Sequence, residues 1–545
     1  MKRFLLLVWA LAALPAFAQQ NISSGGYGYW QDVIQYSDIY SSGSARMNAI
    51  QNAQVGLGGD ISNAATNPAG LGLLRRSEFS FSPALISTNT SNTTQYQNPK
   101  TGAFQSNTTT GSGSNFHIGQ MGVVIANPVS ETRPGGFRGG SFAFTLSRIN
   151  QFNNYRTFNS GPMEGTTDRP NSYVDYFLAA AGAGYQNVSP SQTANIFYTS
   201  DYLNNNGSLD QNQFDARNAY AHYLIEYAYD SANNRGSFYS NIPSGIVRQS
   251  GRILNKGYQN QFDAAYGFNL NDKLYLGGGI GIPYVSATQQ VFYQEKLLAT
   301  YATNPQALQY QGFYFDRSEL LSTTGIGFNA KLGGIYQVAK FLRIGISLQT
   351  PTWYSLSTDQ SYNLLPHFIN DQGKAIDYDS SKFTPTFPNG AQTYRINRTS
   401  YSMRTPATFS GGFSLLDEKL GFLSVQGTLI PYSMARLGGT TYSEDNAYLS
   451  AHTRMVSQVR VGGELKVGPL GRLRGGVAWL QNPVIGARDS WSYSFGGGLK
   501  FSNWYVDASA NVFQRRQSYY VYSYSPVLNT IANNVNVQFT VGSYF

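Results

Sequence analysis

The chain ends in the stretch VNVQFTVGSYF, residues 535–545, in which apolar and polar side chains alternate. A membrane-crossing barrel strand has this pattern, because every second side chain faces lipid and the others face the lumen. The stretch therefore predicts the last strand of an outer-membrane β-barrel. One face carries Val535, Val537, Phe539, Val541 and Phe545, and the other carries Asn536, Gln538, Thr540, Gly542 and Tyr544.

The N-terminus has the features of a secretory signal. Lys2 and Arg3 precede an apolar run that ends in Ala16-Phe17-Ala18, which gives signal peptidase small residues at both positions it reads. We therefore predict a signal peptide over residues 1–18 and cleavage before Gln19. A membrane anchor is the alternative, but the run is too short to cross a bilayer and contains a proline.

The composition excludes several classes of protein. The mean hydropathy is -0.30, and after the signal no run of about twenty apolar residues could span a membrane as a helix. A content of 14% aromatic residues, 57 Gly and only 12% charged residues suits a barrel with aromatic girdles. The absence of Cys excludes disulfides and Cys-based metal sites. A net charge of +9 without a dense basic run argues against nucleic-acid binding.

Alternating segments recur along the chain in pairs joined by tight polar turns. Together with a first strand near Glu78–Ile86 and the final strand, they predict about fourteen strands over residues 78–545, an even number as bacterial barrels have. The pairs are Phe116–Ala126 with Ser141–Ile149, Tyr258–Leu270 with Lys273–Ala287, Gly325–Val338 with Phe341–Thr350, Ala407–Leu415 with Leu420–Ile430, Met455–Val467 with Arg472–Leu480, and Ser492–Phe501 with Trp504–Phe513.

The lengths of the connections predict the orientation. Short turns face the periplasm and long loops face outward, so both chain ends are expected on the periplasmic side. The longest loop, Asn154–Gly257, is too long to be without structure, and its stretch Arg217–Asp230 is expected to form a helix of an extracellular cap. The other expected outer loops are Ser87–Asn115, Gln294–Thr324, Pro351–Pro406, Pro431–Arg454, Gln481–Trp491 and Arg515–Asn533.

Residues 19–77 differ in character from the strands that follow. They are rich in Gly and Ala with little charge, and they suit a plug in the lumen of a fourteen-stranded barrel, with a periplasmic tail as the alternative. Within them, Pro68 fixes φ and disfavours helical geometry at Asn67, while Gly70 tolerates unusual backbone angles. Asn67-Pro68-Ala69-Gly70 therefore predicts a rigid kink, or else a simple turn before the first strand.

This order of parts resembles the FadL/TodX family of outer-membrane transporters for hydrophobic compounds. The resemblance rests on the small-residue stretch Gly43–Met47, the Gly58–Asp60 step, Asn67-Pro68-Ala69-Gly70-Leu71 and about fourteen strands ending in Phe545. It implies that the N-terminal segment is a hatch and that Asn67, Pro68 and Ala69 lie inside the barrel. The family's ligand-binding strand residues match no motif in this chain.

No constellation of residues predicts an enzyme, a metal site or a cofactor site. His117 falls in an expected strand, and His222, His367 and His452 fall in separate expected loops. Nucleophile elbows, zinc-helix motifs and calcium loops are absent. The glycine run over residues 277–281 lacks the context of a phosphate loop and indicates close packing against the plug or the wall.

The inward faces of the strands carry candidate ligand-binding cations. A charge on the lipid face costs about 2–4 kcal/mol, so Arg460, Lys331 and Arg343 are expected in the lumen. One interpretation is an ion-pair network that holds the plug. The other is that an unpaired cation, Arg460 or Lys331, receives the carboxylate of an amphipathic ligand. The remaining inward charges are Arg474, Lys500, Glu464 and Asp507.

Three functions follow as hypotheses. The first is passive uptake of long-chain fatty acids or other hydrophobic small molecules, with Tyr310–Phe315 and 364–368 collecting the solute outside. The second is a PorV-like docking or shuttle protein of a secretion system, which would bind protein partners through its outer loops. The third is an adhesin-like protein. Expected partners are outer-membrane lipid, lipopolysaccharide and, through the strand ending at Phe545, the barrel assembly machinery.

Overall fold

A computed structural model provides the structure of the chain. It describes residues 29–38, 43–98, 101–129, 136–165, 172–199, 211–242, 245–300, 312–369, 375–376, 394–519, 521–522 and 525–545. The expected signal peptide, residues 1–18, lies outside the described residues, as do parts of the expected plug. No helix in the described ranges combines the length and apolarity that a membrane crossing requires.

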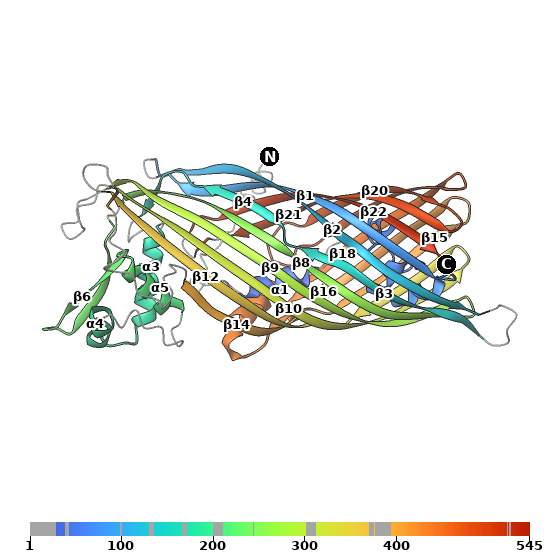
Figure 1. The fold of residues 1–545 in the computed structure, drawn as a ribbon, viewed down its shortest axis with the longest axis horizontal. Helices are drawn as coiled ribbons and strands as arrows, with labels where there is room; N and C mark the ends of the chain where they lie inside the picture. The colour runs from blue at the N-terminus through green and yellow to red at the C-terminus, as the bar shows by residue number, and fades with distance from the viewer. Residues whose placement is uncertain are drawn as a thin grey trace, which may run out of the picture.

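The described strands form a closed antiparallel barrel of fourteen wall strands, which confirms the predicted fold class (Figure 1). Each strand pairs with its neighbour in the chain, and β22 pairs back onto β1 from Glu78↔Tyr544 to Thr94↔Leu528. Three wall strands are interrupted along their length: β3 continues as β4 and β5, β11 as β12, and β14 as β15.

The wall strands coincide with the predicted segments but extend beyond most of them. Their bounds are β1 Glu78–Gln97, β2 Phe104–Pro128, β3 Phe137–Gln151, β4 Asn154–Asn159, β5 Met163–Gly165, β8 Gly245–Leu270, β9 Leu274–Thr300, β10 Gly312–Ala339, β11 Leu342–Gln349, β12 Trp353–Ile369, β14 Tyr394–Arg404, β15 Thr408–Asp417, β16 Gly421–Pro431, β18 Met455–Val467, β19 Gly471–Leu480, β20 Ser490–Lys500, β21 Trp504–Tyr519 and β22 Leu528–Tyr544. Two short strands, β13 Ala375–Ile376 and β17 Arg436–Leu437, pair beside them.

The outward side chains form an apolar band around the lower wall. Most of the exposed large apolar side chains occupy the strand segments predicted to face lipid, and the outward positions beyond them are polar from Ser87 on β1 and from Ser114 to Ser106 on β2. This distribution is that of an outer-membrane barrel. Representative members are Phe81, Phe116, Phe144, Ile280, Ile326, Ile346, Phe413, Leu465, Phe495 and Phe539.

Several expected outer loops are in fact strands. Much of Ser87–Asn115 and Gln294–Thr324, and part of Pro351–Pro406, continue the wall strands, so β9 and β10 reach 27 and 28 residues. Their polar alternation lacks the apolar outward face by which a membrane strand is recognised, and the sequence therefore suggested loops. His367 accordingly lies in β12, and 312–315 of the expected collecting loop Tyr310–Phe315 lie in β10.

The wall is of unequal height. Its short strands contain 10 to 13 residues each and are β15, β16, β18, β19 and β20. The strands β8, β9 and β10 are about twice as long. Above the low side lies α7, Ser443–His452, in the β16–β18 connection, preceded by the single turns η5, Tyr432–Met434, and η6, Thr440–Tyr442.

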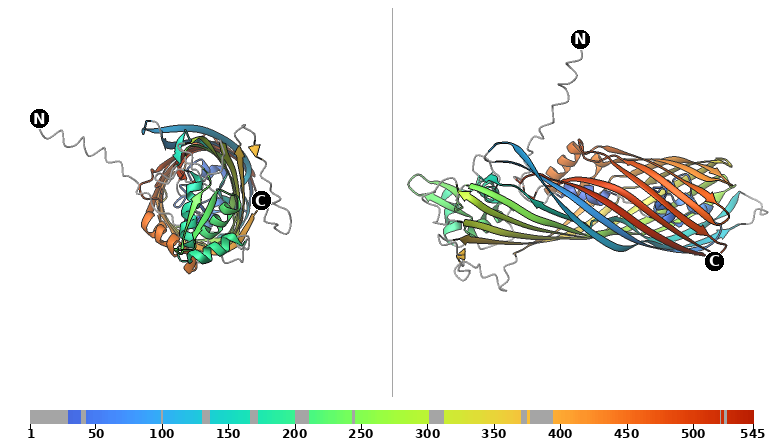
Figure 2. Two further views of the ribbon diagram at one scale, coloured as in Figure 1. Left: turned by 90° about the vertical axis from the view of Figure 1, so that its left-hand side faces the viewer. Right: turned by 90° about the horizontal axis from the view of Figure 1, so that it is seen from above.

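The lumen contains the N-terminal segment, as expected of a plug (Figure 2). Its elements are α1 Trp30–Ser37, α2 Ala45–Asn48 and the 3-10 turns η2 Ile61–Ala65 and η3 Pro68–Leu73. Ser44 caps α2 by accepting a hydrogen bond from Met47 N, and Asp60 caps η2 by accepting one from Ser62 N.

A small cap covers the end of the tall wall. It consists of α3 Tyr173–Tyr185, α4 Pro190–Tyr198, α5 Gln211–Ala221 and the hairpin β6 Ile225–Asp230 with β7 Arg235–Ser240. The predicted helix over Arg217–Asp230 is therefore half wrong, because α5 ends at Ala221 and β6 begins at Ile225. Its alternating Tyr residues pack in the hairpin instead of along a helix.

The outward apolar band predicts a strong asymmetry between arginine substitutions. We expect Ile346→Arg, in the band, to destabilise the barrel by about 2–4 kcal/mol, because the guanidinium would enter lipid. Ser106→Arg, on the polar outward face of β2, is the matched control and should change stability by less than about 0.5 kcal/mol. Denaturant unfolding in lipid vesicles measures both, and equal costs would contradict the assigned band.

Candidate functional site

The Asn67-Pro68-Ala69-Gly70 motif forms a capped 3-10 turn deep in the lumen. Asn67 Oδ1 accepts from Ala69 N at 3.2 Å, and Asn67 Nδ2 donates to the Val55 carbonyl at 2.7 Å. Pro68 begins the turn, where its missing N–H leaves no donor unsatisfied. A Cβ on Gly70 would lie 2.4 Å from Asn63 Oδ1, so this position requires glycine. The motif is therefore a rigid part of the plug.

Glycines in the wall make room for this turn. A Cβ on Gly267 of β8 would lie 2.2 Å from the Pro68 carbonyl oxygen, and one on Gly277 of β9 would lie 2.4 Å from the Pro68 carbonyl carbon. On β10, a Cβ at Gly333 would lie 1.8 Å from Asn67 Oδ1. The plug backbone thus contacts the wall directly, as the glycine run over 277–281 indicated.

Other strands of the wall hold the plug in the same way. A Cβ on Gly462 of β18 would lie 2.3 Å from the Ile50 carbonyl oxygen, and one on Gly345 of β11 would lie 2.0 Å from that of Val55. On β22, Gln538 Nε2 donates to the Gly43 carbonyl at 2.7 Å, and Thr540 Oγ1 accepts from Ala45 N at 2.8 Å. The plug therefore has partners all around the wall.

An ion network joins the plug to β18, β19 and β21. Arg46 lies 3.6 Å from Glu464 and 3.7 Å from Asp60. Glu464 also pairs with Arg474 at 2.7 Å, and Arg474 pairs with Asp507. These inward charges therefore form an ion-pair network that joins the plug to the wall, which is the first of the two interpretations given above.

Two of the three candidate ligand-binding cations are engaged by the protein. Lys331 forms a fully buried ion pair with Asp263 of β8, so it is not the unpaired cation that the sequence suggested. Arg343 donates to Gln337 Oε1 at 3.3 Å and to the Leu57 carbonyl of the plug at 3.0 Å. Both side chains therefore support the wall or the plug.

Arg460 differs from these two. Its guanidinium donates to Gln458 Oε1 of the same strand at 2.8 Å, and no carboxylate of the described residues lies within ion-pair distance. It lies one inward position above Gly462, where the plug residue Ile50 contacts the wall. Arg460 is thus a half-buried lumen cation on the outer side of the plug.

Helix α1 lies in the lumen at the level of the low wall. Val33 and Tyr36 are buried against Val285, Leu356 and Met403. The buried carboxylate of Asp32 accepts a hydrogen bond from the Tyr401 hydroxyl. The result is an aromatic and apolar environment around α1, which includes Tyr29, Phe152, Tyr354 and Tyr442.

The N-terminal end of α1 contacts the connection that carries α7. Trp30 N donates to Asp445 Oδ1 at 3.1 Å, and the Trp30 ring lies 4.4 Å from that of Tyr448. Burial raises the pKa of the Asp445 carboxyl, although the hydrogen bond from Trp30 opposes this shift. Helix α7 therefore closes the low side of the wall over α1.

The hydrogen-bond ladder of the wall is interrupted between β2 and β3. It runs from Pro128↔Gly139 to Gln120↔Ser147, and above it β3 shifts register against β8 between Arg148 and Asn150. Within the described residues, 104–119 of β2 have no ladder partner on this side. The interruption begins within the apolar band, since Phe116 and Ile118 are exposed outward.

Helix α1 is attached beside this interruption. Asn150 Nδ2 donates to the Gln35 carbonyl at 2.9 Å and to the Asp38 carbonyl at 2.7 Å. The Tyr36 ring contacts the Phe152 ring at 5.4 Å between centroids. Asn150 of β3 and Phe152 just after it therefore attach α1 to this part of the wall.

The cap lies at the end of the barrel away from the C-terminus (Figure 1). An apolar cluster joins α3 and α4 to the tall strands β8, β9 and β10. The buried Glu295 of β9 accepts from Tyr173 N at 2.9 Å, from Tyr293 Oη at 2.7 Å and from Gln249 Nε2 at 3.0 Å. The cap is therefore fixed to the long strands by an apolar cluster and a buried carboxylate.

The sequence did not suggest three of the residues that organise this site. Asp263 follows the outward Phe262, so strand alternation places its side chain in the lumen, as it does that of Lys331. The sequence therefore contained a signal from which their ion pair could have been predicted. Asn150 and Asp32 had no comparable signal, since their partners are backbone carbonyls and a tyrosine far away in the chain. Groups of three or more His or acidic side chains able to hold a metal are absent from the described residues.

Comparison with solved structures returns outer-membrane barrels that cover most of this chain. A FadL homologue of Pseudomonas aeruginosa is 14% identical with a TM-score of 0.48 and covers 93% of this chain and 99% of its own. The toluene transporter TbuX of Ralstonia pickettii is 14% identical with a TM-score of 0.44, covering 92% and 98%. The toluene transporter TodX of P. putida is 10% identical with a TM-score of 0.44, covering 91% and 98%.

No protein-family model and no curated protein sequence matches the chain. The likeness to the solved structures concerns the fold. These neighbours are a FadL homologue and toluene transporters, the kind of protein that the order of parts in this chain resembles.

The wall glycines predict how to loosen the plug. Gly277→Val would force a side chain into the Pro68 backbone, so we expect destabilisation of about 1–3 kcal/mol and a plug more accessible to protease. Gly278→Val is the matched control, because a Cβ there would lie 3.4 Å from its nearest neighbour, Leu332. Limited proteolysis with N-terminal fragment analysis measures the difference, and identical digestion of both variants would contradict this plug contact.

Proposed function

We propose that this protein carries hydrophobic or amphipathic small molecules, such as long-chain fatty acids, passively across the outer membrane. The observation that carries the proposal is the interruption of the β2–β3 ladder in the apolar band, beside α1. A solute leaving at this height would enter lipid instead of water. That exit suits an apolar molecule, whose transfer to water would cost about 25 cal/mol per Å² of apolar surface.

The presence of the plug in the lumen is a second argument that polar solutes are excluded. Porins leave an aqueous channel, whereas here the N-terminal segment contacts the wall on all sides. We propose that residues 19–77 act as a hatch, with Asn67, Pro68, Ala69 and Gly70 as its fixed part and α1 as its movable part. The fixed part has direct backbone contacts with glycines, while α1 is attached by side chains.

The surroundings of α1 offer the apolar part of a binding site. Displacement of α1 would uncover the faces of Tyr354, Tyr401 and Phe152, which it now covers. Ligand sites of this type are lined by aromatic and apolar side chains with few polar groups. Because Asn150 connects α1 to β3, a ligand that displaces α1 would also act on the proposed exit.

Arg460 offers the polar part. It lies one inward position from the Gly462 contact with the plug, and no carboxylate of the described residues is within ion-pair distance, although Asp38 acts on it at longer range. A guanidinium binds a carboxylate through two parallel hydrogen bonds. Lys331 and Arg343, the other two cations considered, keep a supporting role in this proposal because Asp263 and the Leu57 carbonyl engage them. An amphipathic ligand would thus orient its carboxylate toward Arg460 and its tail toward β3.

The docking role is not favoured. A PorV-like protein would need an outer surface for its partner, and the cap is the obvious place. The apolar side chains of the cap face inward onto the barrel mouth, and Tyr198 is the one large apolar side chain that the described cap exposes. Recognition of the last strand by the barrel assembly machinery stays a prediction, for which the exposed Phe545 at the chain end is the candidate residue.

The Arg460 proposal predicts a ligand-specific loss of affinity. We expect Arg460→Gln to weaken binding of a labelled long-chain fatty acid by about 10-fold or more, the scale of a charge-assisted hydrogen bond of 1.5–3 kcal/mol. Binding of the corresponding fatty alcohol should be unchanged. Arg398→Gln, on the outer part of β14 and paired with Asp359, is the control. Equal loss for acid and alcohol would contradict carboxylate recognition at Arg460.

The exit proposal predicts that a bridge between β2 and β3 stops release without stopping binding. The chain has no Cys, so His117→Cys with Arg148→Cys introduces a single pair for a short thiol cross-linker. We expect transfer of the fatty acid from protein to vesicle lipid to fall at least 10-fold after cross-linking. Each single variant treated with the same reagent is the control. Unchanged transfer across the bridged wall would overturn the lateral route.

A further inference from the structure

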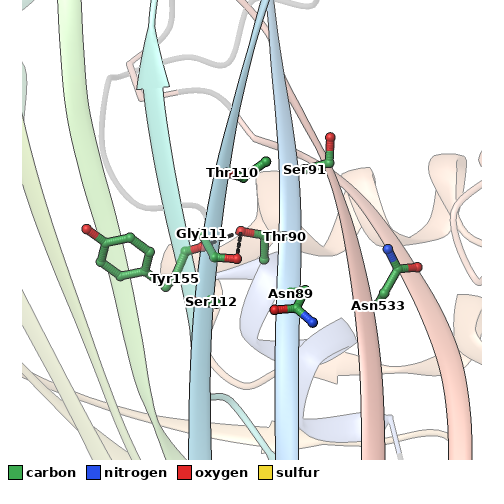
Figure 3. A pocket seen from close by; sticks show the side chains of 8 residues that line it. All are labelled: Asn89, Thr90, Ser91, Thr110, Gly111, Ser112, Tyr155 and Asn533. Carbon is green, nitrogen blue, oxygen red and sulfur yellow. Dashed lines mark hydrogen bonds between the residues drawn. The ribbon is translucent and has the colours of Figure 1, made fainter.

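A concavity of about 500 Å³ lies on the outer wall, away from the lumen (Figure 3). Asn89 and Ser91 of β1, Thr110 and Ser112 of β2 and Asn533 of β22 line it. Asn89 is in register with both Ser112 and Asn533, so the three side chains stand in one row on the outward face. The concavity therefore belongs to the regular wall and does not depend on a loop.

Its inner side is formed where β4 passes behind the β1–β2 hairpin. Thr90 Oγ1 donates to the Tyr155 carbonyl at 2.5 Å, which fixes β4 against the hairpin. A Cβ on Gly111 would lie 2.5 Å from Tyr155 Cδ1, so glycine at this position lets the tyrosine ring approach. Figure 3 shows the Tyr155 ring beside β2, on the side away from β1.

The lining is neutral and rich in hydrogen-bonding groups. No Asp, Glu, Lys, Arg or His lines the concavity. Asn and Ser side chains both donate and accept hydrogen bonds, and within the described part of the chain those of Asn89, Ser91 and Ser112 have no hydrogen-bond partner. A neutral ligand with many hydroxyl groups fits this lining, whereas a phosphate or a carboxylate would find no cation.

The height of the concavity identifies what faces it in the membrane. On the same strands, Leu85 pairs with Phe116, and these outward side chains are 48% and 69% exposed. Asn89 follows Leu85 by four residues, which places it roughly 10 Å higher along a tilted strand. The row thus begins where the acyl chains end, in the layer of lipid head groups.

We propose that this concavity binds sugar residues of a glycolipid of the outer leaflet. The Asn and Ser/Thr row would exchange hydrogen bonds with sugar hydroxyls, and the Tyr155 ring would contact an apolar C–H face of the sugar, as aromatic rings with a polar tip do at wet interfaces. The site is separate from the lumen and independent of the transported solute.

The experiment compares glycolipid retention among surface variants. Wild type, the double variant Asn89→Ala/Asn533→Ala and the control Asn529→Ala, four residues further along β22, are purified in detergent with lipopolysaccharide added. Native mass spectrometry counts the glycolipid retained. We expect the double variant to retain at least 10-fold less than wild type and the control to match wild type. Near-identical thermal unfolding of the three proteins would confirm that the wall is intact.

A second arm identifies the recognised part and its source. Delipidated core oligosaccharide should displace the retained glycolipid from wild type, because the sugars carry the recognition. Equal retention by wild type and the double variant would overturn the site. Displacement by a sugar-free anionic phospholipid but not by the oligosaccharide would overturn sugar recognition. Tight binding of the free oligosaccharide without retention of the glycolipid would contradict the proposal that the bound sugars belong to a membrane lipid.

Discussion

The ladder between β1 and β22 is the interaction on which the rest of the structure depends. In the apolar core of a membrane, an unpaired backbone N–H or C=O costs several kcal/mol, and only closure of the sheet removes the two edges. Closure joins Glu78 to Tyr544, residues from opposite ends of the barrel sequence. The lumen, the contacts of the plug and the outward apolar band all follow from it.

Within the closed wall, glycine replaces side-chain packing as the means of holding the plug. Gly267, Gly277 and Gly333 meet the Asn-Pro-Ala turn, and Gly345 on β11 and Gly462 on β18 meet other plug residues. This arrangement leaves little freedom to the fixed part of the plug. Helix α1 is held differently, through the side chains of Asp32, Tyr36 and Asn150, and the two modes of attachment separate a rigid element from one that a ligand could displace.

The fourteen strands could be predicted from the alternation of apolar and polar side chains. A polar side chain that faces lipid costs free energy, so the outward positions of these strands are apolar. Beyond the apolar band this penalty is absent, and the sequence therefore predicts loops at Ser87–Asn115 and Gln294–Thr324, much of which is strand in the structure. In the site, strand alternation places the side chains of Lys331 and Arg343 on the lumen face, where the structure has them. Alternation does not tell which residues these side chains contact. The pair with Asp263 and the contact of Asn150 with α1 depend on three-dimensional proximity across the lumen, which one sequence does not encode locally.

The contacts of the plug with both sides of the lumen also bear on the order of biogenesis. Its residues form hydrogen bonds to β22, the barrel strand that comes last in chain order, and contact β8, β9 and β10 elsewhere on the wall. A segment so enclosed is most easily placed while the cylinder is still open. The seam would then close around a resident N-terminus, and the plug would serve as a template that sets the circumference at which the first and last strands meet.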